Sequence, residues 1–154
     1  RKLDAVAAMA ATLGLAERVN LRCERVERTG HQPECRGRFQ LAMARAVASA
    51  PVVAEYLVPL LAPAGRAVLY RGQWSGEDQL ELDRALVLLQ ARLEQAEQRD
   101  LPAGRGHRTA LTVVPEGVCP AAYPRAVGLP AKLPLGQPQP ARPTQQRRRR
   151  RPDG

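Results

Sequence analysis

The chain has 154 residues, of which 44% are apolar, and a formal net charge of +9 at pH 7. This length is enough to bury one hydrophobic core, so we expect one folded domain. No apolar stretch approaches the ~18 residues that a membrane-spanning helix needs, and we expect no secretory leader. Composition therefore argues against a membrane protein, and we expect a cytoplasmic location.

The positive charge is concentrated at the C-terminus. Residues 141–154 contain six arginines and one aspartate, so they carry five of the nine net charges. Residues 147–151 are an unbroken arginine run without an apolar partner. We expect residues 139–154 to form a disordered tail that binds polyanions non-specifically. A solubilising tail with no dedicated partner is an equally good interpretation.

The cysteines and histidines do not form a metal-binding or disulfide pattern. Cys23, Cys35 and Cys119 are odd in number, widely spaced and without a Cys-x-x-Cys pair. We therefore expect no disulfide framework and no metal, which favours a reducing cytoplasm. His31 and His107 fall in predicted loops and are interpreted as surface residues.

The first third of the chain predicts one helix and one strand. Residues 2–13 have the apolar spacing of a helix that stops at Gly14. Residues 19–23 alternate as a strand, and residues 24–38 are a polar loop. Because the chain begins with Arg1 and not methionine, we expect a fragment that starts inside an α/β unit.

Residues 39–48 (FQLAMARAVA) are the most informative stretch. This apolar run predicts a buried strand that places Arg45 at its carboxyl end. Ligands bind at that end of the strands in an open α/β sheet, so Arg45 is a candidate site residue. From the local pattern alone, an arginine that caps a strand edge or pairs with a nearby carboxylate is the more ordinary interpretation.

A helix and a second strand follow. Residues 51–61 predict a helix with Ser49 as its N-cap, kinked or shortened by Pro59. Residues 66–70 are a short apolar strand that ends at Arg71. This strand–helix–strand order is typical of an α/β fold and places a second arginine at a second strand end.

A long helical pattern opens at Ser75, which forms a weak capping box with Asp78. Its apolar residues are Leu80, Leu82, Leu86, Leu89 and Leu93. Residues 108–114 then predict a strand, which could pair as a hairpin with a stretch near residues 94–99. We therefore expect a parallel sheet that is finished by one antiparallel strand.

Four segments of the chain resemble one protein family, in the same order. They are residues 1–3 (RKL), 25–27 (RVE), 44–48 (ARAVA) and 123–135 (YPRAVGLPAKLPL). The last is the most specific, because the pattern Tyr-Pro-Arg … Gly-x-Pro-x-Lys-x-Pro-Leu has no generic structural reason to recur. The chain is similar to the C-terminal portion of the bacterial ribosomal RNA small subunit methyltransferase G family, also called glucose-inhibited division protein B.

This resemblance implies a Rossmann-like class I S-adenosylmethionine-dependent methyltransferase fold that lacks its N-terminal part and has a terminal antiparallel strand. Residues 1–119 would be the C-terminal portion of the methyltransferase domain, and residues 120–138 the family's C-terminal motif. The family's Gly-rich cofactor loop would precede Arg1. We therefore expect the chain alone to bind S-adenosylmethionine poorly, to leave RNA unmethylated, and to expose a sheet edge and an apolar face.

The resemblance also implies a cofactor site. The loop that contains Arg25, Val26 and Glu27 would border the adenine, with the Glu27 carboxylate reading the base edge. Arg45 would lie in the cleft for cofactor and substrate, where its guanidinium could hold a phosphate or the methionine carboxylate. Glu27 and Arg45 are expected to face one crevice. A solvated loop glutamate is the alternative interpretation of Glu27.

The implied reaction is methylation of a guanine at N7 in 16S ribosomal RNA, as naked RNA or within the small ribosomal subunit. The N7 lone pair needs no general base, so alignment supplies the catalysis and we name no catalytic residue. Arg71, Arg125 and Lys132 are the expected phosphate contacts. Arg71 stands where the family more often has lysine, and Leu129 and Leu133 replace residues that are usually polar or basic. The full-length protein is expected to be a monomer.

Two alternatives remain open. The chain could be a non-catalytic basic RNA-binding module, which would lose most of its affinity on deletion of residues 141–154. With three Tyr, one Trp and one Phe, the chain is poorly supplied for a base-stacking platform. An inactive product is the second alternative, and the upstream coding sequence would distinguish it from the enzyme.

Overall fold

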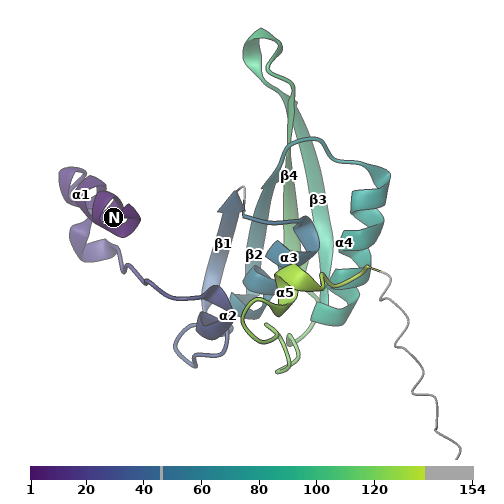
Figure 1. Ribbon diagram of the computed structural model, residues 1–154, viewed down its shortest axis with the longest axis horizontal. Helices are drawn as coiled ribbons and strands as arrows, with labels where there is room; N and C mark the ends of the chain where they lie inside the picture. The colour runs from purple at the N-terminus through teal and green to yellow at the C-terminus, as the bar shows by residue number, and fades with distance from the viewer. Residues whose placement is uncertain (46, 138–154) are drawn as a thin grey trace, which may run out of the picture.

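Four strands form one mixed sheet in the computed structural model, which describes residues 1–45 and 47–137 (Figure 1). In spatial order they are β1 (Phe39–Arg45), β2 (Leu61–Arg71), β4 (His107–Pro115) and β3 (Ala91–Asp100). β1 and β2 are parallel, whereas β4 is antiparallel to both of its neighbours. The predicted α/β class and the β3–β4 hairpin are confirmed. The antiparallel strand is the last in the chain, but it lies inside the sheet and not at its edge.

The helices that follow β1 and β2 form where their sequence signals predict them. Ser49 stands at the N-cap of the first helix as predicted, but its side chain makes no capping hydrogen bond. α3 (Ala50–Leu57) continues as a 3-10 turn, η2 (Val58–Leu60), because Pro59 cannot donate the hydrogen bond that would extend the α-helix. α4 (Gly76–Leu89) begins with the predicted capping box, in which Ser75 Oγ accepts from the Asp78 N–H at 3.1 Å. α4 ends before Gln90, which has a left-handed backbone (φ 56°), so the predicted helical position of Leu93 is wrong.

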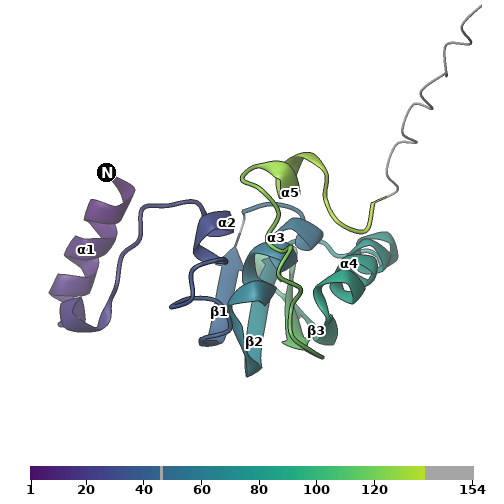
Figure 2. The ribbon, with the colours of Figure 1, turned by 90° about the horizontal axis from the view of Figure 1, so that it is seen from below.

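The core lies between α3, α4 and one face of the sheet. Its members are apolar side chains with at most a few per cent of their surface exposed. From the strands and α4 they include Leu69, Leu82, Leu86, Leu89, Leu111 and Val113. Complete burial of such a side chain contributes roughly 1.5–3 kcal/mol to stability. These side chains fix how α3 and α4 lie on the sheet, as seen along the strands in Figure 2.

β1 is buried on one face only, so the prediction of a fully buried strand is wrong. Ala42 and Ala44 pack against the core, while Leu41 and Met43 point to the other face, where Met43 is 60% exposed. Strand side chains alternate between the faces, and no helix in the described part of the chain covers the second one. β1 is also the edge of the sheet. This arrangement matches the expected exposed edge and apolar face.

The N-terminal region does not join the sheet. α1 (Lys2–Thr12) forms as predicted but buries only Ala10, and it lies apart from the strands in both views (Figures 1 and 2). Residues 19–23 are not a strand, because they lie on the link after η1 (Ala16–Arg18) and have no neighbouring strand for backbone pairing. α2 (Val26–Thr29) is a single turn inside the predicted loop.

Two further segments complete the described chain. η3 (Pro102–Gly104) forms the tip of the β3–β4 hairpin, and α5 (Leu129–Lys132) lies in the segment that follows β4. That segment ends with Leu135 buried in the core. Among the helices that the structure describes, none is both long and apolar enough to cross a membrane. The predicted tail, residues 139–154, lies outside the described residues.

Candidate functional site

A cavity of about 500 Å³, which we call the strand-end cavity, opens beside the carboxyl ends of β1 and β2. Its lining residues are Arg45, Tyr70, Leu101, Arg105 and Arg108. Arg45 is the last residue of β1 and pairs in register with Tyr70 of β2. Leu101, Arg105 and Arg108 lie at the loop end of the β3–β4 hairpin, which projects beyond this end of the sheet (Figure 1). This is the edge at which open α/β sheets bind ligands.

The lining of the strand-end cavity is basic and includes no carboxylate. Arg105 Nε donates to the Pro102 carbonyl at 3.1 Å, and Arg108 Nη1 donates to the His107 carbonyl at 2.7 Å. Within residues 1–45 and 47–137, none of the three arginines forms an ion pair. Three uncompensated guanidinium groups around one cavity attract anions. Arg45 therefore stands where the sequence predicts it, and its role stays a prediction.

Glu27, the predicted adenine contact, is directed toward the C-terminal segment. Its side chain belongs to α2 and the residue is only 2% exposed. One oxygen accepts from Arg25 Nη2 at 2.6 Å and from the Gly128 N–H at 3.0 Å, and the other accepts from Arg25 Nε at 3.1 Å. Burial alone would raise the pKa of this carboxyl, but these hydrogen bonds outweigh it and hold the pKa at about 2.

The structure does not bring Glu27 and Arg45 into one crevice. Ala44 packs against the core, so the next residue along β1, Arg45, points to the face without helices. Glu27 instead contacts Gly128 at the start of α5, and α5 packs on α3. The two residues lie on opposite sides of the sheet. Val26 is half-buried in the first turn of α2, beside Glu27.

The three predicted RNA contacts have different environments. Arg125 forms a two-pronged ion pair with Glu55, at 2.9 Å from Nε and 2.7 Å from Nη2. Arg71 is half-buried, and its Nη1 donates to the Ala48 carbonyl at 2.5 Å. Lys132 is exposed at the end of α5. Lys132 is thus accessible to a phosphate without any rearrangement, whereas Arg125 would have to leave Glu55.

Arg36 is a key residue that sequence reasoning missed. Its guanidinium donates to the carbonyls of Gly30 at 2.9 Å, Cys119 at 2.8 Å, Pro120 at 3.0 Å and Tyr123 at 2.6 Å. An arginine in a polar loop carries no local signal of this role, because three of its four acceptors lie more than 80 positions further along the chain.

Glu55 is the second missed residue, and it did carry a signal. It is a carboxylate inside the apolar sequence of α3, with 0% of its surface exposed. A buried carboxylate needs a partner, and Arg125 supplies side-chain and backbone donors. We use the term C-terminal clamp for Glu27, Arg36, Glu55 and the segment that they hold, residues 119–135.

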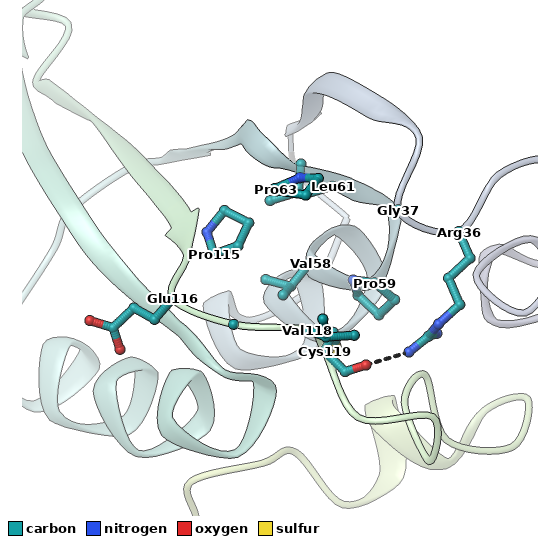
Figure 3. Close-up of a pocket in the computed structure, with 11 residues that line it drawn as sticks. Arg36, Gly37, Val58, Pro59, Leu61, Pro63, Pro115, Glu116, Val118 and Cys119 are labelled. Atoms are coloured by element: carbon teal, nitrogen blue, oxygen red, sulfur yellow. Dashed lines mark hydrogen bonds between the residues drawn. The ribbon is translucent and has the colours of Figure 1, made fainter.

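A second cavity, of about 480 Å³, lies at the opposite end of the sheet and is mainly apolar (Figure 3). Val58, Pro59, Leu61, Pro63 and Pro115 are among its lining residues. Cys119 also lines it, and burial raises the pKa of this thiol to about 11, which keeps it protonated and unreactive. All three cysteines are free. In the described part of the chain, no group of three His, Cys, Asp or Glu side chains is arranged to hold a metal ion.

Comparison with known proteins identifies the family. A family model described as rRNA small subunit methyltransferase G matches residues 1–103. A relative from Synechococcus sp. (strain RCC307), named ribosomal RNA small subunit methyltransferase G, is 63% identical over 135 residues, which are 88% of this chain and 57% of the relative.

Two further relatives carry the same name. The protein from Synechococcus sp. (strain WH7803) is 62% identical over 136 residues, which are 88% of this chain and 54% of the relative. The protein from Prochlorococcus marinus (strain MIT 9313) is 58% identical over 136 residues, which are 88% of this chain and 55% of the relative. The chain thus spans a little more than half the length of the curated relatives it matches. The matched family model covers well over half of the chain, and this chain belongs to the rRNA small subunit methyltransferase G family.

Proposed function

We propose that this chain is the C-terminal portion of an S-adenosylmethionine-dependent methyltransferase that modifies a guanine of 16S ribosomal RNA at N7 in the cytoplasm. The observation that carries the proposal is the 63% identity to a ribosomal RNA small subunit methyltransferase G over 88% of the chain. The basic strand-end cavity supports it, because a cavity lined by three arginines suits a polyanionic substrate.

The residues of this chain fit the methionine end of the proposed cofactor better than its adenine end. The exposed guanidinium of Arg45 suits the carboxylate of the methionine part, which it could hold by two parallel hydrogen bonds. The Glu27 carboxylate is buried and holds Arg25 and Gly128, so a contact with adenine requires Arg25 to move first. S-adenosylmethionine, when bound, supplies an electrophilic methyl group on a positively charged sulfur.

The proposed chemistry needs orientation more than acid–base groups. As the N7–carbon bond forms, the carbon–sulfur bond breaks, and the positive charge passes from sulfur to the guanine without any proton transfer. The chain's contribution is to hold the RNA backbone and the anionic end of the cofactor so that nucleophile, methyl and leaving group are in line. Arg45, which ends β1 and lines the strand-end cavity, is the candidate for holding the anionic end of the cofactor.

The test compares two proteins. One is the 154-residue chain, and the other is this chain preceded by the part of the Synechococcus RCC307 relative that lies upstream of the matched region. Each is incubated with S-adenosylmethionine and small ribosomal subunits that lack 7-methylguanine, and the product is mapped by borohydride reduction and aniline cleavage. We expect a single N7-methylated guanine with the joined protein and none with the chain alone. A joined protein that binds the cofactor but methylates no guanine of 16S RNA would contradict the proposal.

Cofactor binding by the isolated chain is measured separately by calorimetry. We expect weak binding, because none of the described residues forms a Gly-rich loop that could approach the cofactor closely. Micromolar affinity for the chain alone would show that the residues described here are sufficient to bind S-adenosylmethionine.

A further inference from the structure

We propose that the loop end of the β3–β4 hairpin is an RNA-binding surface in which Arg105 and Arg108, beside Arg45, hold the phosphate backbone and Tyr70 stacks on a base. This inference rests on the proposed function, since it assigns a contact for the proposed RNA substrate. It names residues of the hairpin that lie beyond residues 1–103, the part of the chain that the family model matches.

The first argument is geometric. Arg45 reaches the strand-end cavity from β1, Tyr70 from β2, and Arg105 and Arg108 from the hairpin. The hairpin extends past the end of the sheet and therefore forms a wall beside the strand ends (Figure 1). The loop at its end is closed by a hydrogen bond from the Leu101 N–H to the Gly106 carbonyl at 2.8 Å. Residues from three strands thus converge on one cavity.

The second argument is electrostatic. Six described arginines form ion pairs with carboxylates; they are Arg22, Arg25, Arg66, Arg92, Arg99 and Arg125. In the part of the chain that the structure describes, the three arginines of the strand-end cavity have no such partner. Their mutual repulsion is relieved by an anion between them. Guanidinium groups suit phosphate because their fork of N–H donors matches its oxygens.

The third argument concerns the aromatic ring of Tyr70. This residue is 44% exposed on the face without helices. In register it lies between Arg45 of β1 and the small residue Ala110 of β4. Exposed aromatic rings beside basic groups are the contacts that proteins use for single-stranded nucleic acid, where bases are free to stack. An acidic peptide would use the arginines but not the ring.

The test measures the affinity of the full 154-residue chain for a fluorescent single-stranded RNA by anisotropy at several salt concentrations. The variants are the double substitution Arg105→Ala with Arg108→Ala and the single substitution Tyr70→Leu. The control is Arg66→Ala, which removes one positive charge elsewhere on the sheet. Arg66 lies on β2 and is already paired with Glu94 at 3.1 Å.

We expect the double variant to lose at least about tenfold in affinity and to reduce the slope of log K against log salt by about 1.4, which corresponds to two lost phosphate contacts on a single strand. Tyr70→Leu should lose about fivefold or more with an unchanged slope, because a stacked base carries no charge. Arg66→Ala should stay within about twofold of the unmodified chain.

The proposal is overturned if Arg66→Ala weakens binding as much as the hairpin variants, since any surface charge would then suffice. It is also overturned if polyglutamate displaces the RNA equally well from the unmodified and Tyr70→Leu chains. Substitution of both hairpin arginines by lysine checks that the losses do not come from unfolding, and it should retain the salt slope. These assays involve no methyl transfer, so failure of the proposed reaction and failure of this surface are separate results.

Discussion

The C-terminal clamp and the strand-end cavity use the same residue type in opposite ways. In the clamp, the guanidinium of Arg125 is 17% exposed and bonded to the fully buried Glu55, and Arg36 is bonded to four carbonyl groups. Around the cavity, Arg45, Arg105 and Arg108 are exposed and lack carboxylate partners among the described residues. Arginines in the first region hold the fold together, whereas those in the second are available to a ligand.

This difference teaches that a motif which identifies a family need not be a contact with its substrate. The most specific sequence segment, residues 123–135, contains the clamp residues Arg125 and Gly128. Both are engaged by carboxylates from α2 and α3. In this structure the segment fastens α5 to α2 and α3, and the RNA contact predicted for Arg125 stays a prediction. The following substitutions test the contrast, from the largest expected effect to the smallest.

Arg125→Leu should have the largest effect on stability. It leaves the Glu55 carboxylate buried without a charged partner, which typically costs about 3–5 kcal/mol in the free energy of unfolding. Urea denaturation followed by circular dichroism measures this loss. The control is the double variant Glu55→Leu with Arg125→Leu, which removes both charges and should recover much of the stability. A loss below about 1 kcal/mol in the single variant would mean that Arg125 is not structural.

Glu27→Gln should lower the free energy of unfolding by about 1–3 kcal/mol at pH 7, less than the full pKa shift implies because its partner Arg25 is largely exposed. The Glu27 pKa is lowered from 4.5 to about 2, so its stabilising effect is complete above pH 4.5 and disappears as the pH falls toward 2. Unfolding curves at several pH values should show the two proteins converging in that window. A difference that is independent of pH would contradict the clamp role.

Gly30→Ala should destabilise the chain by about 1–3 kcal/mol, because a Cβ atom there would lie 2.5 Å from Pro124 Cγ. This contact joins the end of α2 to the clamped segment. Gly72→Ala is the matched control, since nothing lies within 4 Å of a Cβ atom at that position. Equal thermal midpoints for the two variants would show that α2 and Pro124 are not packed together in solution.

Arg108→Leu should have the smallest effect on stability, within about 0.5 kcal/mol, because the side chain is exposed and bonded only to a carbonyl. Its effect should appear in RNA affinity instead. Measured beside Arg125→Leu, it gives the reverse pattern: little change in unfolding and a clear loss in binding. If both variants behave alike in the two assays, the distinction between the two regions is wrong.

Local sequence signals were sufficient for most elements of the fold. The spacing of apolar residues predicted α1, the region of α3 and η2, and α4, and the turn residues predicted the β3–β4 hairpin. Pro59 and the pair Ser75 and Asp78 act through backbone groups within a few residues, so their effects on helix ends were predictable. The apolar run that begins at Phe39 likewise predicted the strand that ends at Arg45. Each of these signals depends on neighbours along the chain.

Only the tertiary structure decided which charged groups are structural and which are available. Glu55 meets Arg125 across 70 positions and Glu27 meets Gly128 across 101, and no local pattern encodes such distances. Residues 19–23 have the alternation of a strand, yet they lack a partner strand and therefore do not form one. The sequence by itself determined the helix and strand periodicity and the family, because both can be recognised from short segments of the chain. Burial, pairing and the free charge of the strand-end cavity were decided by distant segments that meet only in the folded chain.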